Sequence, residues 1–479
     1  MFPMFPMFRR LAGLLVVVAG GLGAVEAATF PPGFSEKRIA HNLRSPSGLA
    51  IDAGGRVFIL EQEGTVRLVK GDTLLPQPFF KVPDMNAQWE RGLMGIALDP
   101  GFDTNGYVYL FHTATTPALH NRVIRVTASG DTAEPASLTV IAEFPPLPAR
   151  GSQDVSWWHM GGGLEFGADG KLYVSLGDHE VGSTAPDLQS VFGKILRFHP
   201  DGTIPEDNPY FHTASGQNRA IWARGLRSPF TMAMKRGTNR LFVADVGGSQ
   251  WEEVNEIQAG KHYGWNLSEG AASSSEHVDP LYTFSRDEGC SVIGGDFYTP
   301  DSLRFPPWFA GQYFVTDFCG GWIRRIDPDS GTVRDFAHGL SYPTGLRFGR
   351  DGHLYYILRD HPTGNIQARG MAYRVMSDSL WPDQESIPAP PVIPEDTSSV
   401  GLHASGASGV AHEEGGLLVG MGAGMGARLH LLVPAHARGL RVTDLSGRTL
   451  WSVSGVRPGS RIEIPPAHAR GVVRYRWIR

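Results

Sequence analysis

A hairpin template that recurs along the chain limits the folds that this sequence can adopt. Three close copies begin at Gly48, Gly163 and Gly345 and read GLAIDAGGRVFIL, GLEFGADGKLYVSL and GLRFGRDGHLYYIL. Each copy has a short apolar strand, a turn rich in Asp and Gly, and a second strand, which is the pattern of a β-hairpin. Two looser copies begin at Gly95 and Phe230.

The strands that follow each hairpin predict a β-propeller. Further strand-like runs, such as TVRLV at Thr65–Val69 and GKILRF at Gly193–Phe198, extend each unit to about four strands. Units of this kind in series are typical of propeller blades. GGDFYTP and GQYFVTDFCGGWIRRID supply one more unit, so an all-β fold of six blades is expected over residues 28–376. A β-sandwich is the alternative, but it would not explain the repeated template.

The two ends of the chain differ from the repeats. Arg9 and Arg10 precede the apolar run LAGLLVVVAGGLGAVEA, which has the layout of a signal peptide and is expected over residues 1–27. A buried N-terminal helix is the alternative. Export predicts a secreted, periplasmic or cell-surface protein. Residues 377–426 are rich in Pro, Gly and Ser and predict a linker, and residues 427–479 predict a small β-domain.

Charge and cysteine content narrow the partners and the compartment. The net charge is −5 and no basic stripe is present, so a nucleic-acid partner is not expected. The two cysteines, Cys290 and Cys319, are an even pair, which favours a disulfide in an exported chain. Two separate buried thiols are the alternative. Two cysteines without nearby paired histidines fall short of a zinc site.

Several polar residues stand just outside the predicted strands, where the loops of a propeller bind ligands. His159 precedes the hairpin that begins at Gly163, and Asp178 follows it. A histidine side chain exchanges a proton near neutral pH, which suits a general base, and a carboxylate bonded to its ring would fix the tautomer. An exposed loop histidine without a function is the alternative.

Two further segments carry candidate ligand contacts. In GLRSPF, Arg227 could polarise a carbonyl or bind a carboxylate, although an inter-blade salt bridge is as good an interpretation. In ADVGGSQWEEVNEI, Gly247 and Gly248 let backbone carbonyls face a ligand. The acidic pair Glu252-Glu253 can supply oxygens to Ca²⁺, with a glycine turn beside solvated glutamates as the alternative.

Taken together, these segments resemble the soluble glucose/sorbosone dehydrogenase family. Members are six-bladed propellers, many of which use pyrroloquinoline quinone (PQQ) and Ca²⁺ to oxidise sugars, and hedgehog-interacting-protein-like chains share the signature. The C-terminal segment, in which PAHARG occurs twice, resembles the sorting domains of type IX secretion cargo, with a carbohydrate-binding or structural module as the alternative. The segments that carry the family resemblance are ERGLMGIALDPGFDTNGYVYL, HMGGGLEFGADGKLYVSLGD, DLQSVFGKILRFHPDGTIPEDNPY, IWARGLRSPF, ADVGGSQWEEVNEIQAGKHYGW, GCSVIGGDFY and GQYFVTDFCGGWI.

The resemblance implies roles for particular residues. His159 would take the proton of the sugar's anomeric hydroxyl while hydride passes to the quinone, Asp178 would hold His159, and Arg227 would lie near the quinone carbonyl. The carbonyls of Gly247 and Gly248 would hold the quinone's Ca²⁺. The remaining implied contacts are Glu90, Arg91, Ser228 and Lys194 for the cofactor, and Glu253 and Tyr263 for a second, structural Ca²⁺.

The chain departs from the family pattern at the cofactor's expected cations. Cys319 stands where the family has a lysine, and Tyr342 and Thr344 stand where it has two arginines. Ser228 and Phe230 replace polar residues that touch the quinone. Since PQQ carries three carboxylates and unpaired buried anions are costly, other cations are needed. The candidates are Lys194, Arg324 and Arg359.

These patterns predict an exported, PQQ- and Ca²⁺-dependent dehydrogenase that oxidises an aldose or a related polyol and passes electrons to an acceptor. A second hypothesis is a non-catalytic propeller that binds a glycan or a protein at the cell surface. A third, a metal-dependent hydrolase such as a lactonase, would need several acidic or Asn ligands converging on one ion, and no such set is evident in the sequence.

Overall fold

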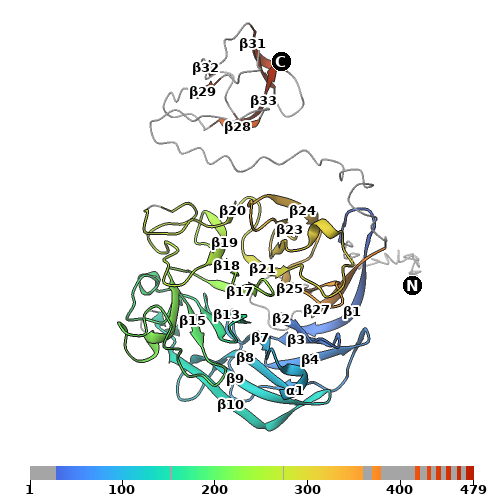
Figure 1. Ribbon diagram of the computed structural model, residues 1–479, viewed down its shortest axis with the longest axis vertical. Helices are drawn as coiled ribbons and strands as arrows, with labels where there is room; N and C mark the ends of the chain where they lie inside the picture. The colour runs from blue at the N-terminus through green and yellow to red at the C-terminus, as the bar shows by residue number, and fades with distance from the viewer. Residues whose placement is uncertain are drawn as a thin grey trace, which may run out of the picture. The chain divides into compact units, whose positions relative to one another are not determined.

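The computed structural model describes residues 28–378, except 151–153, 273 and 360–368, and six strands of the C-terminal segment. The chain divides into two compact units, Met1–Gln384 and Glu385–Arg479. Within the described part of the first unit, six antiparallel sheets of four or five strands form a ring (Figure 1). The predicted all-β, six-bladed propeller is therefore confirmed.

Each of these sheets is one blade, and its strands are given below in order from the centre of the ring outward. The first blade contains β2 (Pro46–Ile51), β3 (Val57–Glu61), β4 (Thr65–Lys70) and β5 (Thr73–Leu74), with β6 (Phe80–Lys81) also paired to β4. The second contains β7 (Leu93–Leu98), β8 (Tyr107–Ala114), β9 (His120–Ser129) and β10 (Thr132–Pro146). The third contains β13 (Gly161–Phe166), β14 (Leu172–Leu176), β15 (Lys194–Phe198) and β16 (Ile221–Arg224).

The other three blades repeat this arrangement. The fourth contains β17 (Pro229–Met234), β18 (Leu241–Asp245), β19 (Trp251–Ile257) and β20 (Tyr282–Ser285). The fifth contains β21 (Val292–Phe297), β22 (Tyr313–Asp317), β23 (Ile323–Ile326) and β24 (Val333–Ala337). The sixth contains β25 (Pro343–Phe348), β26 (Leu354–Arg359), β27 (Arg369–Ser377) and β1 (Phe34–Arg44). Connections carry the helix α1 (Phe102–Asn105), the hairpin β11 (Ala149–Arg150) and β12 (Asp154–Val155), and the 3₁₀ helices Gly182–Thr184, Gly216–Ala220 and Pro307–Phe309.

The repeated template forms the two innermost strands of the blades. Its close copies are the hairpins β2–β3, β13–β14 and β25–β26, and its looser copies are β7–β8 and β17–β18. The inner strands β2, β7, β13, β17, β21 and β25 contact one another in a closed ring. The connections that start and end these hairpins are therefore brought together around one axis.

The N-terminal strand closes the ring. β1 pairs antiparallel with β27, in a register that runs from Phe34 opposite Ser377 to Arg44 opposite Arg369. The sixth blade thus takes its outermost strand from the start of the propeller and its inner strands from the end. The hairpin template does not include this strand, and the sequence pattern did not predict the pairing.

Aromatic side chains fill the space between neighbouring blades. Phe58 meets Phe79 and Phe102 edge to face, with ring centroids 4.9 Å and 5.8 Å apart, and Phe242 meets Tyr313 at 5.1 Å. Such pairs add about 0.5–1.5 kcal/mol each beyond the burial of their area. This packing fixes the blades and so holds the loops at their ends in place.

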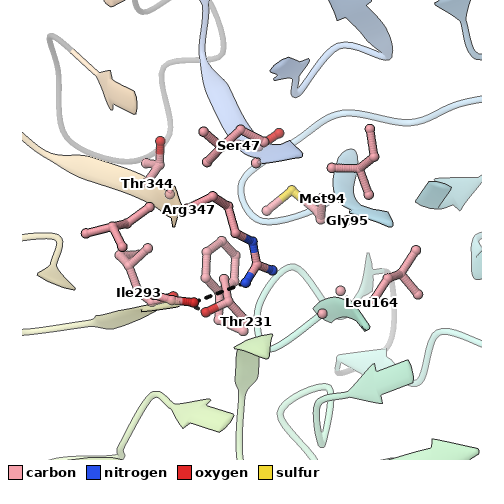
Figure 2. A pocket seen from close by; sticks show the side chains of 17 residues that line it. Ser47, Met94, Gly95, Leu164, Thr231, Ile293, Thr344 and Arg347 are labelled. Atoms are coloured by element: carbon pink, nitrogen blue, oxygen red, sulfur yellow. Dashed lines mark hydrogen bonds between the residues drawn. The ribbon is translucent and has the colours of Figure 1, made fainter. Parts of the chain in front are cut away.

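The centre of the ring is nearly filled. Figure 2 shows Arg347, on β25, reaching into the space between the inner strands. Its guanidinium donates to the carbonyls of Met232 (2.9 Å) and Gly295 (3.1 Å) and lies 3.5 Å from the Glu165 carboxylate. The remaining cavity of about 30 Å³ has room for one or two waters. A sugar does not fit there, and the candidate site residues lie on the loops instead.

The second unit contains strands only, as far as the structure describes it. One sheet has the order β28 (Gly416–Gly420), β33 (Gly471–Ile478), β30 (Gly439–Thr443) and β31 (Thr449–Ser454), and a second pairs β29 (Leu429–Leu432) with β32 (Arg461–Ile464). β28 lies within the segment expected to be a linker. The expected signal peptide at residues 1–27 and most of the linker lie outside the described residues. Among the described helices, none is long and apolar enough to span a membrane.

Candidate active site

The residues singled out in the sequence stand at one end of the propeller. Glu90, His159 and Arg227 come just before the inner strands β7, β13 and β17, and Asp178 comes just after β14. In an antiparallel hairpin, the start of the first strand and the end of the second lie side by side. The ring of inner strands therefore gathers these side chains on the same face.

His159 and Asp178 form a hydrogen-bonded pair. Nδ1 of His159 lies 2.6 Å from Oδ1 of Asp178, while Nε1 of Trp265 donates to Oδ2 of Asp178 across 2.7 Å. Burial by itself would raise the pKa of Asp178, but the hydrogen bonds from His159 and Trp265 outweigh it and the pKa is lowered. The carboxylate therefore stays ionised, accepts a hydrogen bond from the Nδ1–H group and leaves Nε2 of His159 as the proton acceptor.

The backbone of the site adopts unusual conformations. His159 has φ 60°, and Trp89, His179 and Glu180 have φ 57°, 50° and 65°. Such values are uncommon for residues other than glycine, and they collect at functional sites because the surrounding structure must hold them. At Gly177 a Cβ would lie 2.0 Å from the His159 carbonyl oxygen, so only glycine allows the histidine to sit this close to β14.

Glu90 holds the backbone of the histidine. Its Oε2 accepts a hydrogen bond from the His159 N–H at 2.5 Å, and its own N–H donates to the Trp157 carbonyl at 3.2 Å. Burial raises the pKa of Glu90, and the nearby charges of His159 and Arg227 partly offset this. Glu90 thus interacts with both His159 and Arg227. Arg91 is only 2% exposed and donates to Oε1 of Gln88 at 2.6 Å.

Arg227 packs against Trp265, the residue that also donates a hydrogen bond to Asp178. Its Cζ lies 5.5 Å from the centre of the Trp265 ring, and its Nη1 donates to the Val246 carbonyl at 3.0 Å. The backbone N–H groups of Arg227 and Ser228 donate to Asp245, at 2.9 Å and 2.6 Å. Burial raises the pKa of Asp245 to about 7. Ser228, which is 3% exposed, is part of this turn.

The carbonyls expected to hold Ca²⁺ contact an arginine. Nη2 of Arg286 donates to the carbonyl oxygens of Gly247 at 2.6 Å and Gly248 at 3.0 Å. Nη1 of the same guanidinium lies 2.8 Å from Oε1 of Glu252 and also donates to the Cys290 carbonyl. A protein cation therefore contacts the two carbonyls for which the sequence predicted a metal ion, and the metal contacts of Gly247 and Gly248 stay a prediction.

The residues expected at a second Ca²⁺ have protein partners. The carboxylate of Glu253 accepts from the Gly270 N–H at 2.6 Å and from Nδ2 of Asn255 at 3.2 Å, and burial raises its pKa to about 8. The Tyr263 hydroxyl donates to the Glu256 carbonyl at 2.7 Å. Among the residues that the structure describes, no three His, Cys, Asp or Glu side chains are grouped to hold a metal. A structural Ca²⁺ stays a prediction.

Lys194 is committed to the interior of its blade. It is fully buried, and its Nζ donates to the carbonyls of Thr184, Ala185 and Phe192 at 2.7, 2.8 and 2.7 Å. Burial lowers its pKa to about 7. All three donors of its ammonium have carbonyl partners, so the contacts of Lys194 do not support a role at the cofactor, and that role stays a prediction.

The other expected replacement cations also have internal partners. Arg324 pairs with Glu288 at 2.9 Å and with Asp335 at 3.1 Å. Arg359 is 7% exposed and donates to Oε1 of Gln62 at 3.0 Å. Neither arginine presents a free charge that could take the place of the family's cations beside an anionic cofactor.

The positions that depart from the family pattern are used for packing. Cys319 forms the predicted disulfide with Cys290, with their Cα atoms 5.4 Å apart. The Tyr342 ring packs on Phe318 with centroids 5.1 Å apart, and the Thr344 hydroxyl donates to the Pro46 carbonyl at 2.8 Å. None of these three contacts involves a cation.

A tryptophan cluster next to the histidine was not predicted. The Trp89 ring stacks on Trp157, with centroids 5.7 Å apart and an interplanar angle of 15°, and lies 5.1 Å from the Trp158 ring. All three side chains are half-buried. Trp89 precedes Glu90 and Trp158 precedes His159, so tryptophans adjacent to candidate site residues were the signal that could have revealed the cluster.

Similarity to known proteins extends over most of the propeller. The family model for glucose/sorbosone dehydrogenase matches residues 43–368. The aldose sugar dehydrogenase YliI of Escherichia coli is 27% identical over 341 residues, covering 64% of this chain and 87% of that protein. The PQQ-bound structure of the aldose sugar dehydrogenase of Streptomyces coelicolor has 25% identity and a TM-score of 0.58, covering 72% of this chain and 100% of that one.

A second kind of relative has a different name. The hedgehog-interacting protein of Homo sapiens is 27% identical over 231 residues, which cover 42% of this chain and 32% of that protein. The family model begins within β1 and ends just before β27, so it spans all the strands from β2 to β26. By the extent of this match, the chain belongs to the glucose/sorbosone dehydrogenase family.

Proposed function

We propose that this chain is a sugar dehydrogenase that oxidises a hydroxyl of an aldose or a related polyol. The observation that carries the proposal is the pair formed by His159 and Asp178, which Trp265 completes. This arrangement leaves Nε2 of a partly exposed histidine as a proton acceptor on the ligand-binding face. Oxidation of a hydroxyl requires such an acceptor, because the hydroxyl proton must leave as the carbon–hydrogen bond is broken.

Each residue of the cluster has a separate task in this proposal. His159 takes the hydroxyl proton at Nε2, and Asp178 keeps the ring in the correct tautomer and stabilises the positive charge that forms on it. Glu90 fixes the backbone that positions His159. Arg227 places a positive charge beside the oxygen atoms of the reacting groups. A quinone such as PQQ, when bound, would supply the hydride acceptor.

The described residues suit the flat ring of a quinone but not its calcium ion, and Lys194, Arg324 and Arg359 do not supply cations for its carboxylates. Arg227 and the half-buried Trp265 ring offer a cation and a flat surface beside the histidine. The Gly247 and Gly248 carbonyls, in contrast, are bonded to Arg286. The proposal therefore includes PQQ without the Ca²⁺ that the resemblance implies at this position.

A sugar is the substrate class that the surroundings of His159 favour. The rings of Trp89, Trp157 and Trp158 form an aromatic surface next to the base, and aromatic faces suit the apolar face of a sugar ring. Two relatives are named aldose sugar dehydrogenases. The Cys290–Cys319 disulfide supports an exported enzyme, which would reduce an electron acceptor outside the cytoplasm.

Reconstitution tests the proposal. The purified protein is incubated with PQQ, and reduction of a dye is followed with a panel of aldoses and polyols. We expect turnover with at least one sugar, and loss of turnover in the His159→Ala variant although that variant retains its fold and its quinone. Absence of turnover with every sugar, in protein that retains no quinone absorbance, would refute the proposal.

One set of observations favours a second candidate function, a propeller that binds a glycan or a protein without catalysis. The positions where the resemblance implies three cofactor-binding cations hold Cys319, Tyr342 and Thr344, all of which make packing contacts. A hedgehog-interacting protein is among the relatives. Binding of a sugar to quinone-free protein, with no turnover after reconstitution, would support this candidate.

A further inference from the structure

Arg286, which directly follows β20, reaches with its side chain to the loop that follows β18. The loop contributes the carbonyls of Gly247 and Gly248, and both accept hydrogen bonds from the same nitrogen, Nη2 of Arg286. Two carbonyl oxygens that converge on one point are an arrangement that proteins use for Ca²⁺, which binds oxygen ligands including backbone carbonyls. Here the point of convergence is the nitrogen of a guanidinium.

The guanidinium is held in this position from its other side. Nη1 lies 2.8 Å from Oε1 of Glu252, a residue that is fully buried, and donates to the carbonyl of Cys290 in the disulfide. Glu252 in turn accepts from the Val292 N–H at 2.8 Å. Arg286, whose side chain is 29% exposed, is therefore held by an ion pair with Glu252 and by charge-assisted hydrogen bonds to carbonyls, which are stronger than neutral ones.

The N–H groups of the same loop donate hydrogen bonds to a carboxylate. Oε1 of Glu269 accepts from the N–H groups of Gly248 and Gln250 at 2.8 Å, of Ser249 at 2.9 Å and of Trp251 at 3.0 Å. The loop thus has its carbonyls bonded to a cation and its N–H groups bonded to an anion. Both sets of backbone groups are satisfied by side chains of this chain.

We infer that Arg286 permanently replaces the divalent cation at the Gly247 and Gly248 carbonyls, so that this site does not bind Ca²⁺. A metal ion could reach these oxygens only if the guanidinium left them, since two positive charges at that distance repel strongly. Departure of Arg286 would leave Glu252 buried without its partner. The inference holds whether or not the chain oxidises sugars, because it concerns the loop alone.

Terbium luminescence tests the inference in the unmodified chain. Tb³⁺ binds to Ca²⁺ sites and emits when a nearby tryptophan is excited, and a Cβ placed on Gly248 would lie 3.1 Å from the Trp265 ring. We expect the wild-type protein and Trp265→Phe to give equal terbium emission. Stronger emission in the wild type than in Trp265→Phe would place the ion at this loop and overturn the inference.

The Arg286→Ala variant provides the complementary test. Removal of the guanidinium frees the two carbonyls and the Glu252 carboxylate, so we expect terbium emission that depends on Trp265 and an increase of at least tenfold in Ca²⁺ affinity. Arg286→Lys, which keeps a positive charge, is the matched control and should not gain binding. A folded Arg286→Ala protein that gains no Ca²⁺ binding would show that these carbonyls do not form a cation site, which would also overturn the inference.

Discussion

Nδ1 of His159 and Oδ1 of Asp178 lie 2.6 Å apart, and this contact joins the two ends of the hairpin β13–β14. The hairpin thereby positions a base and the carboxylate that orients it with a single structural unit. Since the hairpin is part of the ring of inner strands, both residues are held by the packing of the propeller. The predictions below follow from this pair and its neighbours.

Replacement of Asp178 by Asn should impair the base without removing it. An amide can no longer stabilise the positive charge that forms on the His159 ring, and it can favour the wrong tautomer. We expect kcat to fall by about 10²- to 10⁴-fold, with a small change in KM. Steady-state kinetics of the reconstituted enzyme measure this, with the exposed Asp103→Asn as the matched control. An unchanged kcat would remove Asp178 from its assigned role.

The same pair should contribute to stability in a pH-dependent way. The pKa of Asp178 is lowered in the folded protein relative to its unfolded value of about 3.9. Its contribution is therefore fully present above that value and is lost as the pH falls through the folded pKa. Urea unfolding of the wild type and Asp178→Asn should show a stability difference at pH 7 that shrinks below about pH 4. A difference that stays constant over this range would contradict the assigned shift.

Lys194 should act in folding and not in cofactor binding. Lys194→Met leaves the Phe192 carbonyl without its donor, whereas the carbonyls of Thr184 and Ala185 still accept from backbone N–H groups, and one buried unsatisfied group costs about 1–3 kcal/mol. We expect the free energy of unfolding to fall by at least that amount, while the exposed Lys261→Met has little effect. Chemical denaturation measures both variants. Unchanged stability together with a loss of PQQ affinity would show that Lys194 serves the cofactor after all.

The tryptophan cluster should determine sugar affinity. Trp89→Ala removes the ring that contacts both Trp157 and Trp158, so we expect KM for the sugar to rise by about 3- to 10-fold while kcat changes little. Trp308→Ala is the control, since this tryptophan is also half-buried but packs in the fifth blade. Equal KM values in the wild type and Trp89→Ala would exclude the cluster from the sugar site.

The fold was predictable because its signal is local and repeated. Each hairpin combines short apolar strands with an Asp- and Gly-rich turn, and both features are visible within about 14 residues of sequence. The pairing of β1 with β27 joins the two ends of the propeller, and neither strand belongs to the template. Such a long-range pairing leaves no local pattern, so it was missed.

The site was predictable only where its polar residues lie directly beside the ends of predicted strands. His159 and Asp178 flank a recognisable hairpin, so their contact follows from the hairpin itself. Arg286 reaches the Gly247 carbonyl from a position 39 residues along the chain, through a loop whose path the sequence does not specify. The burial of Lys194 was missed for a related reason: a lysine inside a strand can be buried when nearby loop carbonyls accept its hydrogen bonds, and those carbonyls belong to residues of any type.

The most direct test of the account is the oxidation of a sugar deuterated at its reacting carbon. PQQ-loaded protein, prepared without added Ca²⁺, is supplied with the protiated and the deuterated aldose, and dye reduction is measured for the wild type and for His159→Ala. The account predicts turnover that slows with the deuterated sugar, and no turnover in the variant. Protein that retains PQQ but oxidises none of the sugars, or a His159→Ala variant as active as the wild type, would contradict it.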